Sequence, residues 1–390
     1  MAGVDLWLVV GGRRWARLVA TELCAFLAPG SPIQLQGNLG DTELLKWWST
    51  SPFRQRIEIV DQPMPCRSPR IGVALIVNEA CQHRSAIEIA LSAGYNVVSE
   101  KPLTFSRQES LQLLSRAGEL GLKLFSTNTY LFADYLHVFR RNWLEGRKLS
   151  EIHLTWTDAT REIRHGQVKD YDSSVPVIFD VLPHIASIVL ATHGETRPDH
   201  SELTVRQGGS TVTARFGCGD LLINANMSRN STRRIRLARF SGPASGVAID
   251  FSVEPGVVSF NQEEPVSADP AWQTKRKPVA EMLRSLKAYF EGGAMDDRLS
   301  PKAALLGNDM IDGVVGSYVQ QQIDFLGEQT RLQDPARSTD FAYAAKESHS
   351  IAQRALPFLP QESPLRRLAM PCLTEQTPHP EFNQPGKSSC

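Results

Sequence analysis

The sequence places a carboxylate and an imidazole four residues apart, at Asp180 and His184 in the run VIFDVLPHIASIVL. The apolar periodicity of this run predicts a helix over residues 175–193, and on a helix the side chains at positions i and i+4 lie on the same face. One face can therefore offer both groups to a substrate. Imidazole titrates near neutral pH, which suits proton transfer, although an ordinary polar pair on a half-exposed helix is the simpler alternative.

A second charged group lies at the end of a predicted strand. The strand-forming residues 96–99 run directly into Glu100, Lys101 and Pro102. Strands of this kind usually end in turns of small polar residues, so a glutamate and a lysine at this point are unusual. The proline by itself would be explained as a strand stop.

A glycine turn follows the first apolar run, in VVGGRRWARL. A dinucleotide-binding turn has the pattern Gly-x-Gly-x-x-Gly/Ala, in which glycines let the backbone approach a pyrophosphate at a helix N-terminus. Gly11 and Ala16 match its first and third positions, and Arg13 replaces the second glycine, so a plain tight turn is the alternative. The residues of this turn that we expect to contact a cofactor are Gly11, Gly12, Arg13, Arg14 and Trp15.

The second strand lacks the acidic residue that usually binds the ribose hydroxyls of NAD. Its end carries Gln36, Gly37 and Asn38 instead. In the expected fold Arg13 and Arg14 lie nearby, and two guanidinium groups without a carboxylate favour a 2′-phosphate. NADP(H) is therefore the expected cofactor in preference to NAD(H). The alternative is that the two arginines bind the pyrophosphate instead of a 2′-phosphate.

The elements that must position these groups alternate between strand and helix patterns in the first third of the chain. Apolar strand patterns occupy residues 6–10, 32–37, 57–60, 71–78, 95–101 and 123–130. Helical patterns separate them; one ends at Gly94, and another starts after Ser106, with Glu109 at the spacing of a capping box. This alternation predicts a doubly wound parallel α/β sheet, a Rossmann domain, over residues 1–130.

The pattern changes beyond this domain. After a strand at residues 151–159 and the helix at 175–193, consecutive strand patterns separated by turn residues predict a large, mostly antiparallel sheet. With helices at 278–290 and 300–325, residues 131–328 read as an α+β substrate and oligomerisation domain. Residues 329–390 form a C-terminal extension, with an amphipathic helix at 338–356 and a proline-rich, loosely ordered tail.

Composition excludes several classes of protein. Lys+Arg and Asp+Glu balance at 42 each, which argues against binding of nucleic acid or anionic membranes by bulk charge. The six cysteines contain no Cys-x-x-Cys, so we expect no metal site and a reducing, cytoplasmic location. No run is apolar enough to predict a membrane span, and no signal peptide is expected.

The region VALIVNEACQHRSAIEIALSAGYNVVSEKPLTFS resembles the Gfo/Idh/MocA family of oxidoreductases. In that family the fourth strand ends in a turn followed by a histidine, matched here by Asn78 and His83. The fifth strand ends in Glu-Lys-Pro, and the first helix of the second domain carries Asp-x-x-x-His. The resemblance implies a Rossmann domain followed by a domain whose sheet commonly forms the oligomer interface, here of a dimer or tetramer.

The resemblance also implies roles for the residues that carry it. Lys101 would polarise the reacting oxygen or nitrogen, His184 would act as general acid/base, and Asp180 would orient the substrate or the imidazole. The Lys101–Pro102 peptide would be fixed, in either the cis or the trans form, so that the lysine is aimed over the cofactor. The other cofactor contacts implied by position in the family pattern are Asn78, His83, Glu100, Pro102 and Asn128.

Two departures from the family pattern leave the substrate open. The sixth strand ends in STNTY, with Asn128 and Tyr130, where the family often has Asn-Arg-Arg. The run REIRHGQVKDYDSS replaces a more glycine-rich stretch; its Arg164, His165, Lys169 and Tyr171 either read a charged substrate group or belong to a solvated loop.

The leading hypothesis is an NADP(H)-dependent oxidoreductase acting on a C=O/CH–OH or C=N/CH–NH centre of a small polar molecule. Candidate substrates are a sugar, a cyclitol or a biosynthetic intermediate, the last as in thiazolinyl imine reductases, which resemble this fold. The alternative is a non-catalytic NAD(P)-binding regulator or scaffold, with which the degenerate glycine turn and the extended tail are compatible.

Overall fold

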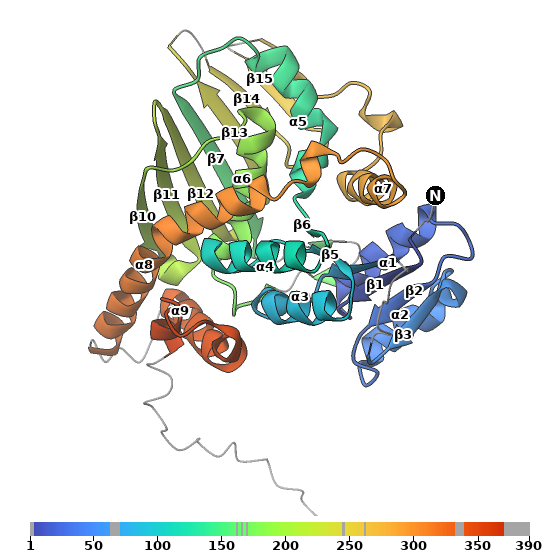
Figure 1. Cartoon of the computed structure of the whole chain (residues 1–390). Coiled ribbons are helices and arrows are strands. Elements are labelled where there is room, and N and C mark those ends of the chain that lie inside the picture. Colours follow the sequence, from blue (N-terminus) through green and yellow to red (C-terminus); the bar gives the residue numbers. More distant parts are fainter. Residues whose placement is uncertain are drawn as a thin grey trace, which may run out of the picture.

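The computed structural model of the chain describes residues 4–62, 71–160, 163–164, 167–168, 171–243, 246–260, 263–331 and 339–369. These residues form two large sheets with helices packed on them, and a short two-stranded ribbon. Figure 1 shows the N-terminal sheet and its helices beside the larger sheet of the second half. None of the described helices is long and apolar enough to cross a membrane.

The first sheet has six parallel strands in the order β3-β2-β1-β4-β5-β6. The strands are β1 (Leu6–Val10), β2 (Ile33–Gln36), β3 (Ile57–Val60), β4 (Gly72–Ile76), β5 (Asn96–Ser99) and β6 (Leu124–Ser126). This is the predicted doubly wound Rossmann sheet. The strand order reverses between β1 and β4, and ligands of such sheets bind at the carboxyl ends of the strands beside this reversal.

Helices cover both faces of the first sheet, which explains why β4 is buried along its whole length. They are α1 (Arg14–Phe26), α2 (Thr42–Thr50), α3 (His83–Ser92) and α4 (Arg107–Glu119), together with α7 (Pro278–Phe290) from the second half of the chain. The helix ends follow the sequence signals: the Ser106 hydroxyl accepts a hydrogen bond from the backbone N–H of Glu109. Gly94 follows α3 at φ +86°.

The second sheet has eight strands in the order β10-β11-β12-β7-β13-β14-β15-β16. They are β7 (Glu151–Ala159), β10 (His200–Arg206), β11 (Thr211–Cys218), β12 (Leu221–Ser231), β13 (Ile235–Ser241), β14 (Gly246–Asp250), β15 (Val257–Phe260) and β16 (Val266–Ser267). Only the β12–β7 pair is parallel, so the sheet is mostly antiparallel, as predicted. The ribbon consists of β8 (Ile163–Arg164) and β9 (Gln167–Val168).

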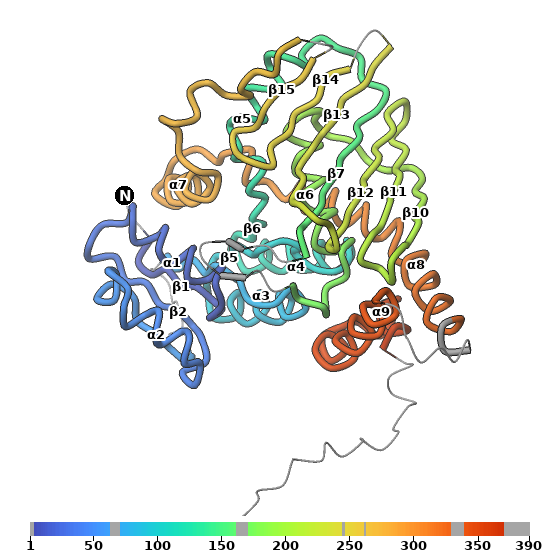
Figure 2. The backbone as a smooth tube through the Cα atoms, turned by 180° about the vertical axis from the view of Figure 1, so that it is seen from behind, coloured from blue at the N-terminus to red at the C-terminus, as the bar shows by residue number. Residues whose placement is uncertain are grey.

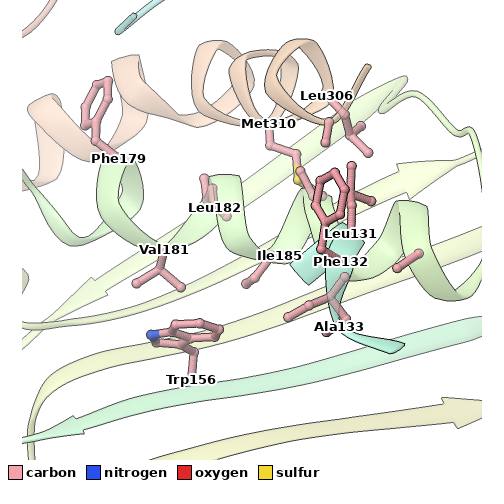
Figure 3. Close-up of a cluster of buried hydrophobic side chains, with 14 of the residues drawn as sticks. Leu131, Phe132, Ala133, Trp156, Phe179, Val181, Leu182, Ile185, Leu306 and Met310 are labelled. Carbon is pink, nitrogen blue, oxygen red and sulfur yellow. The ribbon is translucent and has the colours of Figure 1, made fainter. Parts of the chain in front are cut away.

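One face of the second sheet carries the core of this half. Alternate residues of β7 are buried, and the helices α5 (Asp134–Phe139), α6 (Val177–Thr192) and α8 (Lys302–Arg331) lie on that side. Figure 3 shows α6 between the sheet, represented by Trp156, and Met310 of α8. Gly307 permits the close approach of α8, because a Cβ atom there would lie 3.1 Å from Pro183 Cα. Figure 2 shows the opposite face, which no described helix covers.

The C-terminal extension differs from its prediction. The helix α9 (Thr339–Ser350) continues through a π-helical turn, Ile351–Ala355, into a short 3-10 helix, Leu356–Phe358. The expectation of a loosely ordered segment is wrong for residues 357–369, because Leu359, Leu365 and Leu368 are buried in the main core. The proline content concealed these apolar anchors. Residues 370–390 lie outside the described part of the chain.

Candidate active site

A cleft of about 950 Å³ lies at the carboxyl ends of β1, β2 and β4. Its other wall comes from the loop before α6, from α6 itself and from β12. The described residues that line it are Val10, Gly11, Gly12, Arg13, Trp15, Gln36, Gly37, Asn38, Asp41, Asp61, Val77, Asn78, Glu79, Ala80, Gln82, Lys101, Pro102, Tyr171, Asp172, Val175, Asp180 and Arg229. Of the predicted site residues, the cleft brings together the glycine turn, Asn78, the Lys-Pro pair and Asp180.

The glycine turn lies at one end of this cleft and needs its first glycine. Gly11 has φ +137°, and a Cβ atom there would lie 3.0 Å from the carbonyl oxygen of Val77. The side chain of Arg13, the N-cap residue of α1, forms no hydrogen bond with the first turn of that helix. The turn excludes side chains, and the Arg13 side chain leaves the backbone N–H groups of the first turn of α1 uncapped. These two features together fit a pyrophosphate. The turn therefore suits a dinucleotide, although its sequence pattern is degenerate.

Two predicted contacts of the turn have protein partners. Arg13 Nη2 lies 2.7 Å from Glu79 Oε1, with 71% of the arginine side chain exposed. Trp15 Nε1 donates to Glu100 Oε2 at 2.7 Å. Arg14 does not line the cleft in the described part of the chain.

Glu100 lies below the cleft surface and holds the strand ends together. Its Oε2 atom also accepts a hydrogen bond from Thr127 Oγ1 at 2.7 Å, so one carboxylate connects α1, the end of β5 and the segment after β6. Burial raises the pKa of this carboxyl group, against the opposing effect of Lys101. We conclude that Glu100 shapes the site from behind, and that the next two residues face the cleft. The Lys101–Pro102 peptide bond is cis.

His83 is a buried structural link between two strand ends. Its Nδ1–H donates to the carbonyl oxygen of Pro102 at 2.7 Å, and its Nε2 atom lies 3.4 Å from the carbonyl oxygen of Asn78. Burial lowers the pKa of His83 to about 4, so the imidazole is neutral at physiological pH. Asn78 itself lines the cleft; its buried Oδ1 atom has no hydrogen-bond partner among the described residues, as expected for a ligand contact.

Lys101 and Asp180 meet in the cleft, from the two halves of the chain. Lys101 Nζ lies 2.5 Å from Asp180 Oδ1 and donates to the Asp180 carbonyl oxygen at 2.9 Å. Only 13% of the lysine side chain and 29% of the aspartate side chain are exposed. Because so little of the lysine side chain is exposed, water screens its charge poorly. The ammonium group therefore attracts a polar heteroatom strongly when that atom enters the cleft beside it.

Arg229 completes this group, although no sequence motif marked it as a site residue. Its Nη2 atom lies 3.0 Å from Asp180 Oδ2, and its Nη1 atom donates to the carbonyl oxygen of Val175 at 2.7 Å. Burial lowers the pKa of the guanidinium, but Asp180 and Tyr343 more than offset this, so the net shift is upward. A signal did exist: on β12 Arg229 shares the inward face with Leu221, Ile223, Ala225 and Met227, where a charged residue is unexpected.

His184 lies one turn further along α6, in an aromatic cluster. Its ring stacks on Trp156 at 4.7 Å between centroids, with 14° between the planes, and meets Tyr130 edge-on at 5.4 Å. The described residues that line the cleft do not include it. Of the two groups that the spacing places on one face of α6, only Asp180 therefore lines the cleft among the described residues.

Asn128 is buried beneath the site. Its Oδ1 atom lies 3.4 Å from Ser187 Oγ of α6, and its side-chain amide bonds to Ser126. It lies after β6, which ends at Ser126, and does not line the cleft. Of the loop residues, Tyr171 lines the cleft, Arg164 lies in β8, and His165 and Lys169 lie outside the described residues. No metal-binding group of His, Cys, Asp or Glu exists among the described residues.

Comparisons with solved structures agree with this fold. UDP-N-acetylglucosamine 3-dehydrogenase GnnA from Acidithiobacillus ferrooxidans superposes with a TM-score of 0.60 and 15% identity, over 80% of this chain and 96% of that one. The 3-ketoreductase KijD10 from Actinomadura kijaniata gives 0.61 and 14%, over 80% and 96%. Biliverdin reductase from Synechocystis sp. PCC 6803 gives 0.61 and 15%, over 79% and 97%. At these identities the likeness concerns the fold alone.

A search of curated protein sequences found no match. A family model does match: residues 43–128 fit the oxidoreductase family GFO_IDH_MocA with its NAD-binding Rossmann fold. This segment runs from α2 to the residues after β6 and includes Glu-Lys-Pro. Over these residues the Rossmann domain is therefore similar to the NAD-binding domain of the Gfo/Idh/MocA oxidoreductases.

Proposed function

We propose that the chain is an NADP(H)-dependent oxidoreductase that transfers hydride to or from a C=O/CH–OH or C=N/CH–NH centre of a small polar molecule. The observation that carries this proposal is the Lys101–Asp180 contact, which lines the same cleft as the glycine turn. When bound, the nicotinamide supplies or accepts the hydride. The proteins of similar fold include a sugar-nucleotide dehydrogenase, a 3-ketoreductase and a biliverdin reductase, which supports small polar substrates.

In this proposal the side chains in and beside the cleft bind the reacting group and transfer protons. The ammonium of Lys101 binds the reacting oxygen or nitrogen and stabilises the negative charge that develops on it. Asp180 holds the ammonium in place and orients the substrate. His184, on the same helix face, is the predicted general acid/base, and Lys101 is the other group that could deliver the proton.

NADP(H) is the proposed form of the cofactor. Arg13 extends from the rim of the cleft, and its exposed ion pair with Glu79 contributes little stability, so a 2′-phosphate can displace it. The cleft has two carboxylates at this end, Asp41 and Asp61. The first already accepts hydrogen bonds from the backbone N–H groups of Glu43 and Leu44, and neither lies at the end of β2, where ribose hydroxyls are usually bound.

We also propose that the two halves of the chain bind different molecules. Residues 1–130 would bind the cofactor, and residues 131–328 would bind substrate. The face of the second sheet that no described helix covers would join copies of the chain into a dimer or tetramer (Figure 2). It is polar, with Glu151, His153 and Thr155 on β7.

The proposal is tested first by cofactor binding and then by turnover. Fluorescence titration should show tighter binding of NADPH than of NADH, and mass spectrometry of co-purified ligands should identify a substrate. With that substrate, Lys101→Ala and His184→Ala should each keep NADPH affinity and lower turnover about 100-fold or more, the usual scale of acid–base catalysis.

Two exposed residues provide matched controls. Lys148→Ala and His200→Ala change side chains that are 76% and 68% exposed, and both should turn over normally. Normal turnover by His184→Ala alone would assign proton transfer to Lys101. Normal turnover by both site variants would contradict the catalytic assignment, and binding of neither NADPH nor NADH would contradict the proposal as a whole.

A further inference from the structure

The charges along the rim of the cleft compensate one another. Arg354, from the C-terminal extension, lies 2.7 Å from Glu79 Oε1 and 3.0 Å from Asp172 Oδ1. Arg13 forms the second ion pair of Glu79. Two carboxylates therefore face two guanidinium groups, and this part of the cleft carries no excess charge among the described residues.

The interior of the cleft differs from its rim. Lys101 and Arg229 both pair with a single carboxylate, that of Asp180, one on each oxygen. Two cations against one anion leave an excess of one positive charge among the described residues lining this part of the cleft. Only 13% and 3% of the two cationic side chains are exposed, so water screens this charge poorly.

The fold holds Arg229 in this position from several sides. The β12–β7 register shifts between Ser228 and Ser231, a bulge that surrounds Arg229 and redirects the strand. The guanidinium lies over the ring of Tyr171, 5.5 Å from its centroid, and forms a side-chain hydrogen bond with Tyr343 of α9. Burying a cation costs far more than burying an apolar side chain, so a position built to keep one charged indicates a use for the charge.

The acidic groups outside these pairs lie beneath the cleft surface or at its opposite end. Glu100, next to Lys101 in the chain, does not line the cleft, and burial raises the pKa of its carboxyl group against the opposing effect of Lys101. Asp41 and Asp61 lie at the opposite end, by the ends of β2 and β3. Glu347 lies behind Arg229 and does not line the cleft. Burial raises the pKa of Glu347 to about 7, so it is partly protonated at neutral pH.

We infer that the substrate carries an anionic group, a carboxylate or a phosphate, that binds in the cleft beside Lys101 and over the buried charge of Arg229. This inference rests on the proposed function and narrows its substrate class to acids. The ammonium of Lys101 contacts the reacting heteroatom, and the anionic group lies next to that centre. Arg229 attracts the anion through the low-dielectric wall as a specificity-determining residue. The carboxylates at the other end of the cleft repel the anion and so help to orient the substrate.

Small probes test this inference without the natural substrate. Isothermal titration calorimetry of the full chain, saturated with the nicotinamide cofactor it binds, compares malonate with its neutral analogue malonamide at constant ionic strength. The cofactor occupies the helix N-terminus of the glycine turn, so anions cannot bind there. Malonate should bind about tenfold or more tightly than malonamide, the scale of one charge-assisted hydrogen bond. A parallel titration with inorganic phosphate decides between a carboxylate and a phosphate site.

Variants of the buried arginine locate the effect. Arg229→Met should weaken malonate or phosphate binding about tenfold or more, and Arg229→Lys, which keeps the charge, by less. Arg215→Met is the control, because Arg215 is 54% exposed on β11 and does not line the cleft. Equal binding of malonate and malonamide by the unaltered chain, with no binding of phosphate, would disprove the inference even if no variant folds. Unchanged anion binding by a folded Arg229→Met variant would also disprove it.

The outcome also separates this inference from the proposed function. A chain that binds NADPH or NADH but shows no preference for anions disproves the inference alone. A chain that binds neither cofactor contradicts the proposed function before any anion is added.

Discussion

At the residue scale, the site is a chain of charged contacts that starts in the cleft and ends in the core. Lys101, Asp180 and Arg229 form its accessible part. Behind them lies Glu347, whose Oε1 atom accepts a hydrogen bond from the Tyr318 hydroxyl at 2.5 Å. Its Oε2 atom is buried without a hydrogen-bond partner among the described residues, which is costly for an ionised carboxylate.

Glu347 should make stability depend on pH. Its pKa rises from 4.5 to about 7, chiefly by burial, so the folded state keeps a proton that the unfolded state has lost. Stability from this group therefore falls as pH rises from about 4.5 to about 7, by on the order of 3 kcal/mol. Glu347→Gln removes this pH-dependent loss. In denaturant titrations, the free energy of unfolding of the variant minus that of the unaltered chain should therefore increase from pH 5 to pH 8.

Two features make this comparison specific. His83, with its pKa lowered to about 4, gives the opposite pH dependence of stability. It is present in the unaltered chain and in the Glu347→Gln variant, so its contribution cancels when their free energies of unfolding are subtracted. Glu202→Gln, at a side chain that is 70% exposed, should show no pH-dependent difference. An equal effect of Glu347→Gln at both pH values would mean that Glu347 is ionised throughout.

At the scale of elements, the β1–α1 turn depends on close packing of backbone. A Cβ atom at Gly37, after β2, would lie 2.5 Å from Leu44 Cδ2 and 3.5 Å from Gly12 Cα. Small residues at both places allow the turn to approach α2, and the conformation of Gly11 excludes a side chain. Of the three glycines, only Gly11 matches the usual dinucleotide-binding pattern. Together with Gly12 and Gly37, however, it keeps the backbone of the turn as closely packed as that pattern normally does.

Gly11→Ala should damage both stability and cofactor binding. The substitution forces an alanine to φ +137° and against the carbonyl oxygen of Val77, a strain of about 1–3 kcal/mol. Thermal unfolding should show this loss, and NADPH titration should show affinity lower by about tenfold or more. Gly30→Ala is the control, because a Cβ atom there meets nothing within 4 Å. Equal cofactor affinity of the two variants would remove the turn from the cofactor site.

At the scale of the whole molecule, the C-terminal extension connects both halves at the site. Arg354 pairs with Glu79 after β4 and with Asp172 before α6. Tyr343 contacts Arg229, and Ser350 Oγ lies 2.8 Å from Ser173 Oγ. The extension packs where the turn between β10 and β11 exposes glycine backbone: a Cβ atom at Gly208 would lie 1.9 Å from the carbonyl oxygen of Asp340.

Gly208→Ala should therefore displace α9. Gly208 and Gly219 have nearly the same φ, +62° and +61°, but a Cβ atom at Gly219 meets nothing within 4 Å. Both alanine variants bear the same backbone strain, and only Gly208→Ala adds a steric clash. It should lower the free energy of unfolding by about 1–3 kcal/mol more than Gly219→Ala. Equal losses would show that α9 is not held against this turn.

Local patterns in the sequence determined much of this protein. Strand and helix periodicity predicted the Rossmann sheet, the mostly antiparallel second sheet and the caps at Ser106 and Gly94, because each depends on neighbours a few residues away. The Glu-Lys-Pro stretch and the Asp180–His184 spacing were readable for the same reason.

Only the tertiary structure decided which groups meet. Arg229 joins Lys101 and Asp180, and Arg354 reaches the rim of the cleft, through contacts between residues 49 to 275 positions apart. His83 and Glu100 are site residues by sequence, yet in the fold they support the cleft from beneath its surface. Burial and long-range pairing depend on the packing of the whole chain, so local sequence patterns do not predict them.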